Sequence, residues 1–529
     1  MLFAEASSQL VQIPESTRWL LGIVLIVYLL LLVGVSFIAT RQVKNEEDYL
    51  VAGRKLPLFL CWGTLIATWF GAATMTAAAE AARTEGLLGV ILDPLACAAT
   101  LVFAGLFYAG PLWRLKLLTT GDFFRRTYGR SSEIVAGCIQ VPAYFGWIAL
   151  QYQALGEVAA FYFGIPKVVG IILACLLTLS YTLVGGMWSV TLTDTLQIMI
   201  AFVGLILLAY QTYSIFGDGS AVAGIDRMLA ETPPEYLTVL PPAMTAAILG
   251  YFGLWATGLF GNIPGQDLQQ RIYSAKDSKT ASQACILAGI LYLFFGAIPV
   301  SMGLISRFTH PEVDGKGILQ LMAGSFLTPW MAVVFIVSFV SVVISTATSA
   351  VLAPATILGR NLLSQFAFFR GRGLILDRAC VVLISMCALG MALYFKDGEK
   401  MSLLDLALSM QLVGLFVPVT MGLYGRPRSA WSGIAPIMVG IFFYFLRWVP
   451  EEIMFPLVSN PDQVEFIPYV SANYGKFAGD LMALDASLLG LVFSLLTYVG
   501  IQALLMGKPA INDDVLRQAW PGIDLKEAD

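Results

Sequence analysis

Long apolar stretches separated by short polar loops follow one another from Trp19 to Met506. Each stretch approaches the roughly 20 apolar residues that a helix needs to cross a bilayer. The pattern therefore predicts an all-α integral membrane protein with about thirteen transmembrane helices. The expected spans are 19–39, 57–82, 86–109, 133–162, 166–184, 191–215, 242–262, 282–306, 326–358, 377–395, 403–424, 430–446 and 487–506.

The composition agrees with lipid as the solvent. Hydrophobic residues make up 58% of the 529 residues and charged residues 12%, with a mean hydropathy of +0.78. This balance leaves too little polar surface to cover a water-soluble globule. A formal net charge of −4 gives no reason to expect a nucleic acid partner, and nothing in the chain indicates an obligate protein partner.

The loops predict the orientation. The first eighteen residues carry no basic residue before Arg18, so they lack the positive segment of a signal peptide and the first span is expected to stay. With the N-terminus outside, the inner loops hold roughly two thirds of the 31 Lys and Arg residues. We expect a multi-pass protein of the inner (plasma) membrane with a cytoplasmic C-terminus.

Most enzyme chemistry is missing from the sequence. There is no GxxxxGKS/T loop for ATP phosphates, and the single histidine, His310, excludes a Ser-His-Asp triad or an HExxH zinc site. The seven cysteines show no CxxC spacing. We predict neither catalytic residues nor a cofactor. A secondary transporter fits best, while a channel, or an enzyme built on carboxylates such as Glu80 and Asp93, stays as an alternative.

Two of the spans contain residues that favour a broken helix. The second has Gly63 and Gly71 around Trp69, and the seventh, with the turn after it, has Gly261, Pro264 and further glycines. Broken helices carry the binding sites of many transporters; the alternative is that glycine only allows close helix packing. The two spans lie five apart, which would invert one half relative to the other.

The expected organisation follows from that repeat. It comprises an extracytoplasmic N-terminus (1–18), the first span and a basic inner loop (19–56), repeat one (57–215), repeat two (242–424), two further spans (425–506) and a cytoplasmic tail (507–529).

Three segments resemble the sodium:solute symporter family, which has a LeuT-like fold of five-plus-five inverted repeats. They are YTLVGGMWSVTLTDTLQ (Tyr181 to Gln197), QQRIYSAKDSKTA (Gln269 to Ala281) and SFVSVVISTATSAVLAPATILGRNLL (from Ser338). The matches run in family order from Asp48 to Asn361, and the last hundred residues match only by hydropathy. The resemblance implies a sodium-coupled symporter that imports a small organic solute, with sodium as the coupling ion.

The resemblance also implies a sodium site between the second and ninth spans. Its ligands would be the carbonyls of Ala67, Phe70 and Val342 and the hydroxyls of Ser345 and Thr346. Several oxygens suit a hard cation. The alternative is that both hydroxyls bond back to their own helix.

A second sodium site, found in some members of the family, would use Asp194 with Ser345, Thr348 and Ser349. Ser345, Thr348 and Ser349 share one helical face. The alternative for Asp194 is that it caps the sixth span together with Thr193. A proton in place of sodium also stays open.

The segments around Trp69 (ATWFGAA) and Trp147 (WIALQYQALG) look most like the high-affinity choline transporter branch, which holds a quaternary ammonium with aromatic faces. Tyr144 is a further candidate wall, and one departure is Gly265, where the branch has a tryptophan. An amino acid, sugar or carboxylate cargo is the alternative, and for the tryptophans it is packing. The expected cargo contacts are Trp69, Phe70, Gly71, Asp93, Trp147 and Trp255.

Overall fold

A computed structural model shows an almost wholly helical chain. It describes residues 15–241, 246–313, 317–366, 369, 373–394, 400–455, 467, 470, 472–473 and 484–521. Within these residues the regular structure is helical, apart from one parallel bridge between Leu56 and Ala275. The predicted outer N-terminus (1–18) lies outside the described residues up to residue 14, and the predicted tail (507–529) lies outside them from residue 522.

The helices before the middle of the chain differ widely in length: a run of short helices, α2 to α7, lies between the long α1 and the long pair α8 and α9. The first part contains α1 (Glu15–Thr40), α2 (Glu46–Val51), α3 (Leu58–Trp69), α4 (Ala78–Glu85), α5 (Cys97–Phe103), α6 (Ala109–Arg114), α7 (Thr120–Tyr128), α8 (Arg130–Phe163), α9 (Lys167–Phe216), α10 (Ala221–Glu231) and α11 (Pro234–Leu237). π-Helical turns at Ala73–Ala77, Ile91–Ala96 and Ala104–Tyr108 join several of the short helices into longer spans.

The second part continues with two short helices and then mostly long ones. It contains α12 (Ala246–Gly261), α13 (Gln266–Ser274), α14 (Ser278–Thr309), α15 (Ile318–Phe326), α16 (Pro329–Thr356), α17 (Gly373–Tyr394), α18 (Lys400–Gln411), α19 (Val417–Tyr424), α20 (Trp431–Val449), α24 (Ala486–Leu504) and α25 (Asp513–Ala519). Further π-helical turns lie at Ile357–Leu363, Leu412–Phe416 and Pro450–Met454.

The predicted count of thirteen spans is not confirmed. By length and composition, ten described helices can cross a membrane, or eleven if α3 and the helical segment after it form one bent span. The fifth predicted span (166–184) falls on the shorter apolar helix Lys167–Ser180, ahead of a break in α9 at Gly186, where φ is 53°. The seventh predicted span (242–262) falls on α12, which is described from Ala246 and ends at Gly261, where the turn was predicted; residues 242–245 lie outside the described residues.

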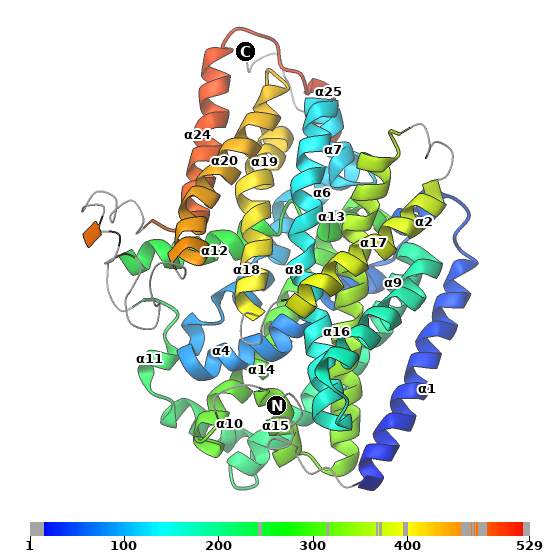
Figure 1. The fold of residues 1–529 in the computed structure, drawn as a ribbon, viewed down its shortest axis with the longest axis vertical. Helices are drawn as coiled ribbons and strands as arrows, with labels where there is room; N and C mark the ends of the chain where they lie inside the picture. Colours follow the sequence, from blue (N-terminus) through cyan, green and yellow to red (C-terminus); the bar gives the residue numbers. More distant parts are fainter. Residues whose placement is uncertain are drawn as a thin grey trace.

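The fold places α16 in the centre of the molecule. In its membrane window 89% of the residues are buried, against 28% for α1 and 22% for α24, which lie at the periphery. Figure 1 shows α10 and α15 at one end of the bundle and α7 and α25 at the other. These four helices lie outside the candidate spans and occupy opposite ends of the bundle, as expected for loops that alternate between the two sides of a membrane. A central helix rich in Ser and Thr then needs polar partners, and the two broken helices supply them.

Candidate functional site

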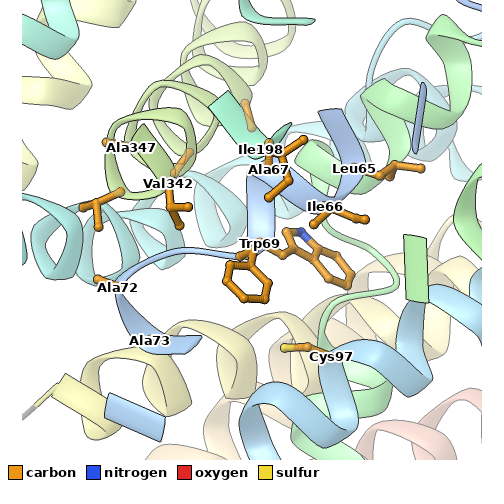
Figure 2. Packing of buried hydrophobic residues seen from close by; sticks show 14 of the residues in the cluster. Leu65, Ile66, Ala67, Trp69, Ala72, Ala73, Cys97, Ile198, Val342 and Ala347 are labelled. Atoms are coloured by element: carbon orange, nitrogen blue, oxygen red, sulfur yellow. The ribbon is translucent and has the colours of Figure 1, made fainter. Parts of the chain in front are cut away.

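The break in α3 exposes backbone carbonyls in the middle of the molecule. α3 ends at Trp69, Phe70 leaves the helical conformation at φ −72° and ψ 83°, and the chain resumes a helix bent by 62° from Ala73. Figure 2 shows the non-helical connection between Trp69 and Ala72 running beside Val342 and Ala347 of α16. A helix end leaves carbonyl groups without their intrahelical partners, and in a membrane interior these groups need another polar group or a cation.

The five oxygens expected to hold the first sodium converge at this break. Ser345 Oγ lies 3.0 Å from the Ala67 carbonyl oxygen and 2.8 Å from that of Val342. Thr346 Oγ1 lies 3.1 Å from the Ala67 oxygen and 3.3 Å from the Phe70 oxygen. All five residues are fully buried. Neighbouring ligands of a cation held at ~2.4 Å lie roughly 3.0–3.4 Å apart, so these residues fit a hard cation such as sodium.

The back-bonding alternative applies to one of the two hydroxyls only. Ser345 does bond to Val342 on its own helix, but it also reaches Ala67 across the interface. Among the described residues Thr346 bonds to Ala67 and Phe70 alone, and so to the broken helix rather than to α16. The hydroxyls therefore face the carbonyls from which a cation would be coordinated.

Gly71 leaves the room that this arrangement needs. A Cβ atom at Gly71 would lie 2.6 Å from Thr346 Oγ1 and 2.8 Å from Gln151 Oε1. That Gln151 oxygen accepts a hydrogen bond from the Ala72 N–H at 2.9 Å and so ties down the far side of the break. Any side chain at Gly71 would push the Thr346 hydroxyl away from the carbonyls.

We therefore expect Gly71→Ala to lower sodium-driven uptake by about tenfold or more, because overpacking a tight interior costs about 1–3 kcal/mol. The measurement is uptake into proteoliposomes together with the sodium concentration for half-maximal rate. Gly390→Ala is the matched control, since a Cβ there meets no atom within 4 Å. Equal losses in the two variants would contradict the tight fit at Gly71.

The four residues expected to form a second sodium site do not all turn toward one point. Ser349 Oγ lies 3.3 Å from Asp194 Oδ2, whereas Thr348 bonds back to Ile344 and Ser345 of its own helix. Ser345 faces the first site. The proposed set is thus only partly assembled. Asp194 Oδ1 is nevertheless buried without a hydrogen-bond partner among the described residues.

Arg271, which was not among the predicted site residues, occupies part of the predicted second sodium site. Arg271 Nη2 lies 2.6 Å from Ser349 Oγ and 3.6 Å from Asp194 Oδ2, and both charged side chains are at most 1% exposed. Thr64 donates to the same carboxylate oxygen at 2.6 Å. The expectation that Asp194 and Thr193 cap the sixth span is wrong, because α9 is already helical well before them and Thr193 bonds back to Ser189 and Val190.

Asp93 belongs to the same central region through its hydroxyl partners. Thr74 Oγ1 lies 2.9 Å from Asp93 Oδ2, and the Tyr292 hydroxyl lies 3.0 Å from Asp93 Oδ1. The Tyr292 hydroxyl also lies 3.0 Å from the carbonyl oxygen of Trp69, and its ring packs edge-on against Phe70 with centroids 5.3 Å apart. Asp93 is thereby joined to the break in α3.

Two further acids within predicted spans, Glu157 and Glu80, have different settings. Glu157 forms a salt bridge with Lys167 at 3.0 Å, and both side chains are 23% exposed. Glu80 accepts a hydrogen bond from the Gly317 N–H at 3.1 Å. Each lies close to a helix end, so these two acids belong to the edges of the bundle.

The aromatic residues expected around the cargo divide into two groups. Tyr144 and Trp147 lie one helical turn apart on α8 with ring centroids 5.9 Å apart, and Tyr144 connects to Trp69 through Asp267. Trp255 on α12 makes no ring contact or hydrogen bond with them, and its buried indole N–H has no partner in the part of the chain that the structure describes. The structure therefore brings Trp69, Phe70 and Trp147 toward one region, whereas Trp255 has no ring contact or hydrogen bond with them among the described residues.

Several residues of the site were missed for an identifiable reason. Asp267 and Arg271 lie on α13, just beyond the predicted seventh span. They therefore did not count as charges inside the membrane, which are candidates for a functional role. Arg271 lies within the quoted QQRIYSAKDSKTA segment, which was a usable signal. Gln151 likewise lies within the WIALQYQALG segment, whereas Tyr292 carried no such signal, because a single polar residue in a membrane helix is common.

Comparison with known proteins agrees with this architecture. A family model described as "Sodium:solute symporter family" matches residues 49–433. The high-affinity choline transporter 1 of Drosophila melanogaster is 30% identical over 64% of this chain, and the match spans just over half, 56%, of that relative's own length. Those of Caenorhabditis elegans and Homo sapiens are each 26% identical, over 85% and 83% of this chain and 82% and 78% of the relatives.

Solved structures of the same architecture support the fold class. A Na+-coupled sialic acid symporter in a substrate-bound outward-open state superimposes with a TM-score of 0.71 at 18% identity, covering 93% of this chain and 98% of the other. The nucleobase-cation-symport-1 family transporter Mhp1 gives 0.55 at 13% identity, with 90% and 99% coverage. The predicted all-helical membrane transporter fold is confirmed.

Proposed function

The chain belongs to the sodium:solute symporter family, and from this premise we propose that it uses an inward sodium gradient to import choline or another small quaternary ammonium. The observation that carries the cationic cargo is the balance of buried charge beside the broken helices. Three buried carboxylates, those of Asp93, Asp194 and Asp267, lie in this region with one buried guanidinium, that of Arg271, which pairs with Asp194. None of the four residues is more than 3% exposed.

The excess of buried negative charge would be neutralised by added cations. With all three carboxylates ionised, one guanidinium leaves two formal negative charges in a region of low dielectric, where an uncompensated charge is costly. One sodium at the site of Ala67, Phe70, Val342, Ser345 and Thr346 and one monovalent cationic cargo would neutralise them. The choline transporters among the relatives favour a cargo of this charge.

Sodium and the cargo are expected to bind cooperatively because both would contact the segment around Phe70. Phe70 supplies a carbonyl to the sodium site while its ring packs against Tyr292 beside Asp93. Sodium would order the unwound connection and fix the Trp69 and Phe70 rings for the cargo. By linkage, the cargo would tighten sodium binding by the same factor. Rocking of the helix bundle would then open the loaded site to the cytoplasm.

A neutral cargo such as an amino acid or a sugar is the second candidate, and a carboxylate cargo would need still more cations. The unpartnered Asp194 Oδ1 favours the neutral cargo, because a second sodium at Asp194, Ser345, Thr348 and Ser349 would supply the missing positive charge. The two candidates differ in whether the cargo itself carries charge.

For the orientation in the plasma membrane we propose the N-terminus outside and the C-terminus in the cytoplasm. The face that carries α7 and α25 would be cytoplasmic. It holds Arg54, Arg126 and Arg360, which pair with Glu47, Asp514 and Asp122 respectively. Excess Lys and Arg on one face is typical of the cytoplasmic side.

The decisive experiment is uptake of radiolabelled choline into proteoliposomes, with and without an inward sodium gradient and with unlabelled proline, a hexose and pantothenate as competitors. Sodium-driven choline uptake is the expected result. Trp69→Leu should lower choline affinity by about tenfold, since a desolvated cation–π contact contributes on the order of 2 kcal/mol.

Trp62→Leu is the matched control for that variant. Trp62 lies on the same helix, but its ring packs edge-on against Phe59, which is 53% exposed on the outside of the bundle. We expect normal choline affinity in this control. Sodium-dependent uptake of one of the competitors without choline uptake would keep the symporter and reject the cationic cargo.

A further inference from the structure

One carboxylate joins two of the aromatic residues in the candidate cargo region. Trp69 donates its indole N–H to Asp267 Oδ2 at 2.5 Å, and Tyr144 donates its hydroxyl to Asp267 Oδ1 at 2.5 Å. Trp69 comes from α3, Tyr144 from α8 and Asp267 from α13, so a single side chain connects three elements that are far apart in the sequence. Each of the three residues is at most 5% exposed.

The carboxylate has no basic partner among the described residues. Arg271, the nearest buried cation along the chain, donates to the main-chain oxygen of Asp267 at 2.9 Å, and its Nη2 atom turns to Ser349 and Asp194. Asp267 also lies in the first turn of α13, where the helix dipole favours a negative charge. Its charge is therefore held in place by hydrogen bonds and is left available to a cation.

Gly265 explains why the carboxylate can occupy this position. A Cβ atom at Gly265 would lie 2.8 Å from Asp267 Oδ1 and 2.9 Å from the carbonyl oxygen of Asn262. A tryptophan at position 265, which the choline transporter branch has there, would collide with the carboxylate. The lost aromatic wall and the buried aspartate are thus two parts of one local arrangement.

We propose that Asp267 is the charge-selecting residue of the cargo site, replacing an aromatic wall with a carboxylate that orients the Trp69 and Tyr144 rings and restricts the cargo to cations. This inference rests on the proposed import of a small organic cation and adds to it the residue that discriminates by charge. Asp267 is a positioning residue, since it acts through the two rings and through its field.

The physical basis has two parts. A cation is attracted to the negative face of an aromatic ring, and donation of the indole N–H to a carboxylate makes that ring richer in electrons. A buried carboxylate also favours a cation over a neutral molecule of the same shape, because the low dielectric strengthens the attraction. A merely structural clamp would position both ligands equally well and would give no preference for charge.

The test compares choline with 3,3-dimethyl-1-butanol, its uncharged isostere, as competitors of sodium-driven uptake in proteoliposomes. Asp267→Asn keeps the shape of the side chain and removes its charge. We expect the inhibition constant of choline to rise by about tenfold while that of 3,3-dimethyl-1-butanol stays within about twofold. Asp226→Asn is the control, because it removes an acid from the exposed face of α10. An equal rise in the inhibition constants of both competitors in Asp267→Asn, or no change in either constant, would overturn the proposal.

Tyr144→Phe is the second variant, and it decides the question if Asp267→Asn does not give a monodisperse protein. It removes one hydrogen bond and keeps the charge, so the ratio of the two inhibition constants should stay near the wild-type value while choline binds more weakly. A ratio that falls toward one would show that ring position, rather than charge, selects the cargo. If the wild-type protein transports another solute and ignores choline, the proposed function fails independently of these ratios.

Discussion

Replacing Ser345 and Thr346 together with alanine is expected to raise the sodium concentration for half-maximal uptake by about 100-fold. The pair supplies two of the five oxygens at the break in α3, and each reaches a carbonyl of the broken helix. A hydroxyl bonded to a charged group contributes about 1.5–3 kcal/mol, so two of them contribute about 3 kcal/mol or more. The measurement is the initial rate of cargo uptake as a function of external sodium.

Thr356→Ala is the matched control for this double variant. Thr356 is also a buried hydroxyl on α16, but it bonds only to the Leu352 carbonyl of its own helix at 2.8 Å. Its loss should leave the sodium dependence unchanged. An unaltered sodium dependence in the double variant, with protein recovered in normal amount, would place the coupling ion elsewhere.

Arg271→Met is expected to destabilise the protein by about 3–5 kcal/mol, because it leaves the Asp194 carboxylate buried without its cation. The guanidinium is 1% exposed and also holds Ser349 and the Thr64 carbonyl. The measurement is the temperature of unfolding in detergent. Adding Asp194→Asn to this variant should recover much of the loss, since the buried charge is then gone.

Arg227→Met tests the same kind of change at the surface. Arg227 pairs with Glu231 along α10 at 2.7 Å, but the two side chains are 45% and 41% exposed. Exposed pairs contribute little, so the unfolding temperature should not change measurably. If Arg271→Met unfolded at the wild-type temperature as well, the buried pair would have no role in stability.

The predicted positions of the chain breaks agree with the structure because they depend on local composition. Gly71 follows Trp69 and Phe70 at the end of α3, and Pro264 and Gly265 lie in the turn before α13, and both breaks fall where these residues predicted them. The number of spans was harder to predict. Hydropathy counts apolar residues, and it does not show that the predicted span 166–184 corresponds to a short apolar helix, Lys167–Ser180, ahead of a break at Gly186.

The first cation site was predicted from motif resemblance, and the structure brings its residues together. Ser345 and Thr346 lie 278 and 279 residues from Ala67 along the chain. No periodicity in either segment shows that they meet. The residues predicted for the second sodium site are only partly brought together. Arg271, from a different helix, donates a hydrogen bond to Ser349 and occupies part of the predicted ion site.

By itself the sequence determined that the chain lies in lipid, where its helices break and to which family its motifs belong, because solvent preference and helix propensity are properties of neighbouring residues. Only the tertiary structure decided that Asp267 joins Trp69 to Tyr144 and that Arg271 faces Asp194. Those contacts join residues of different helices, and their geometry follows from how the helices pack.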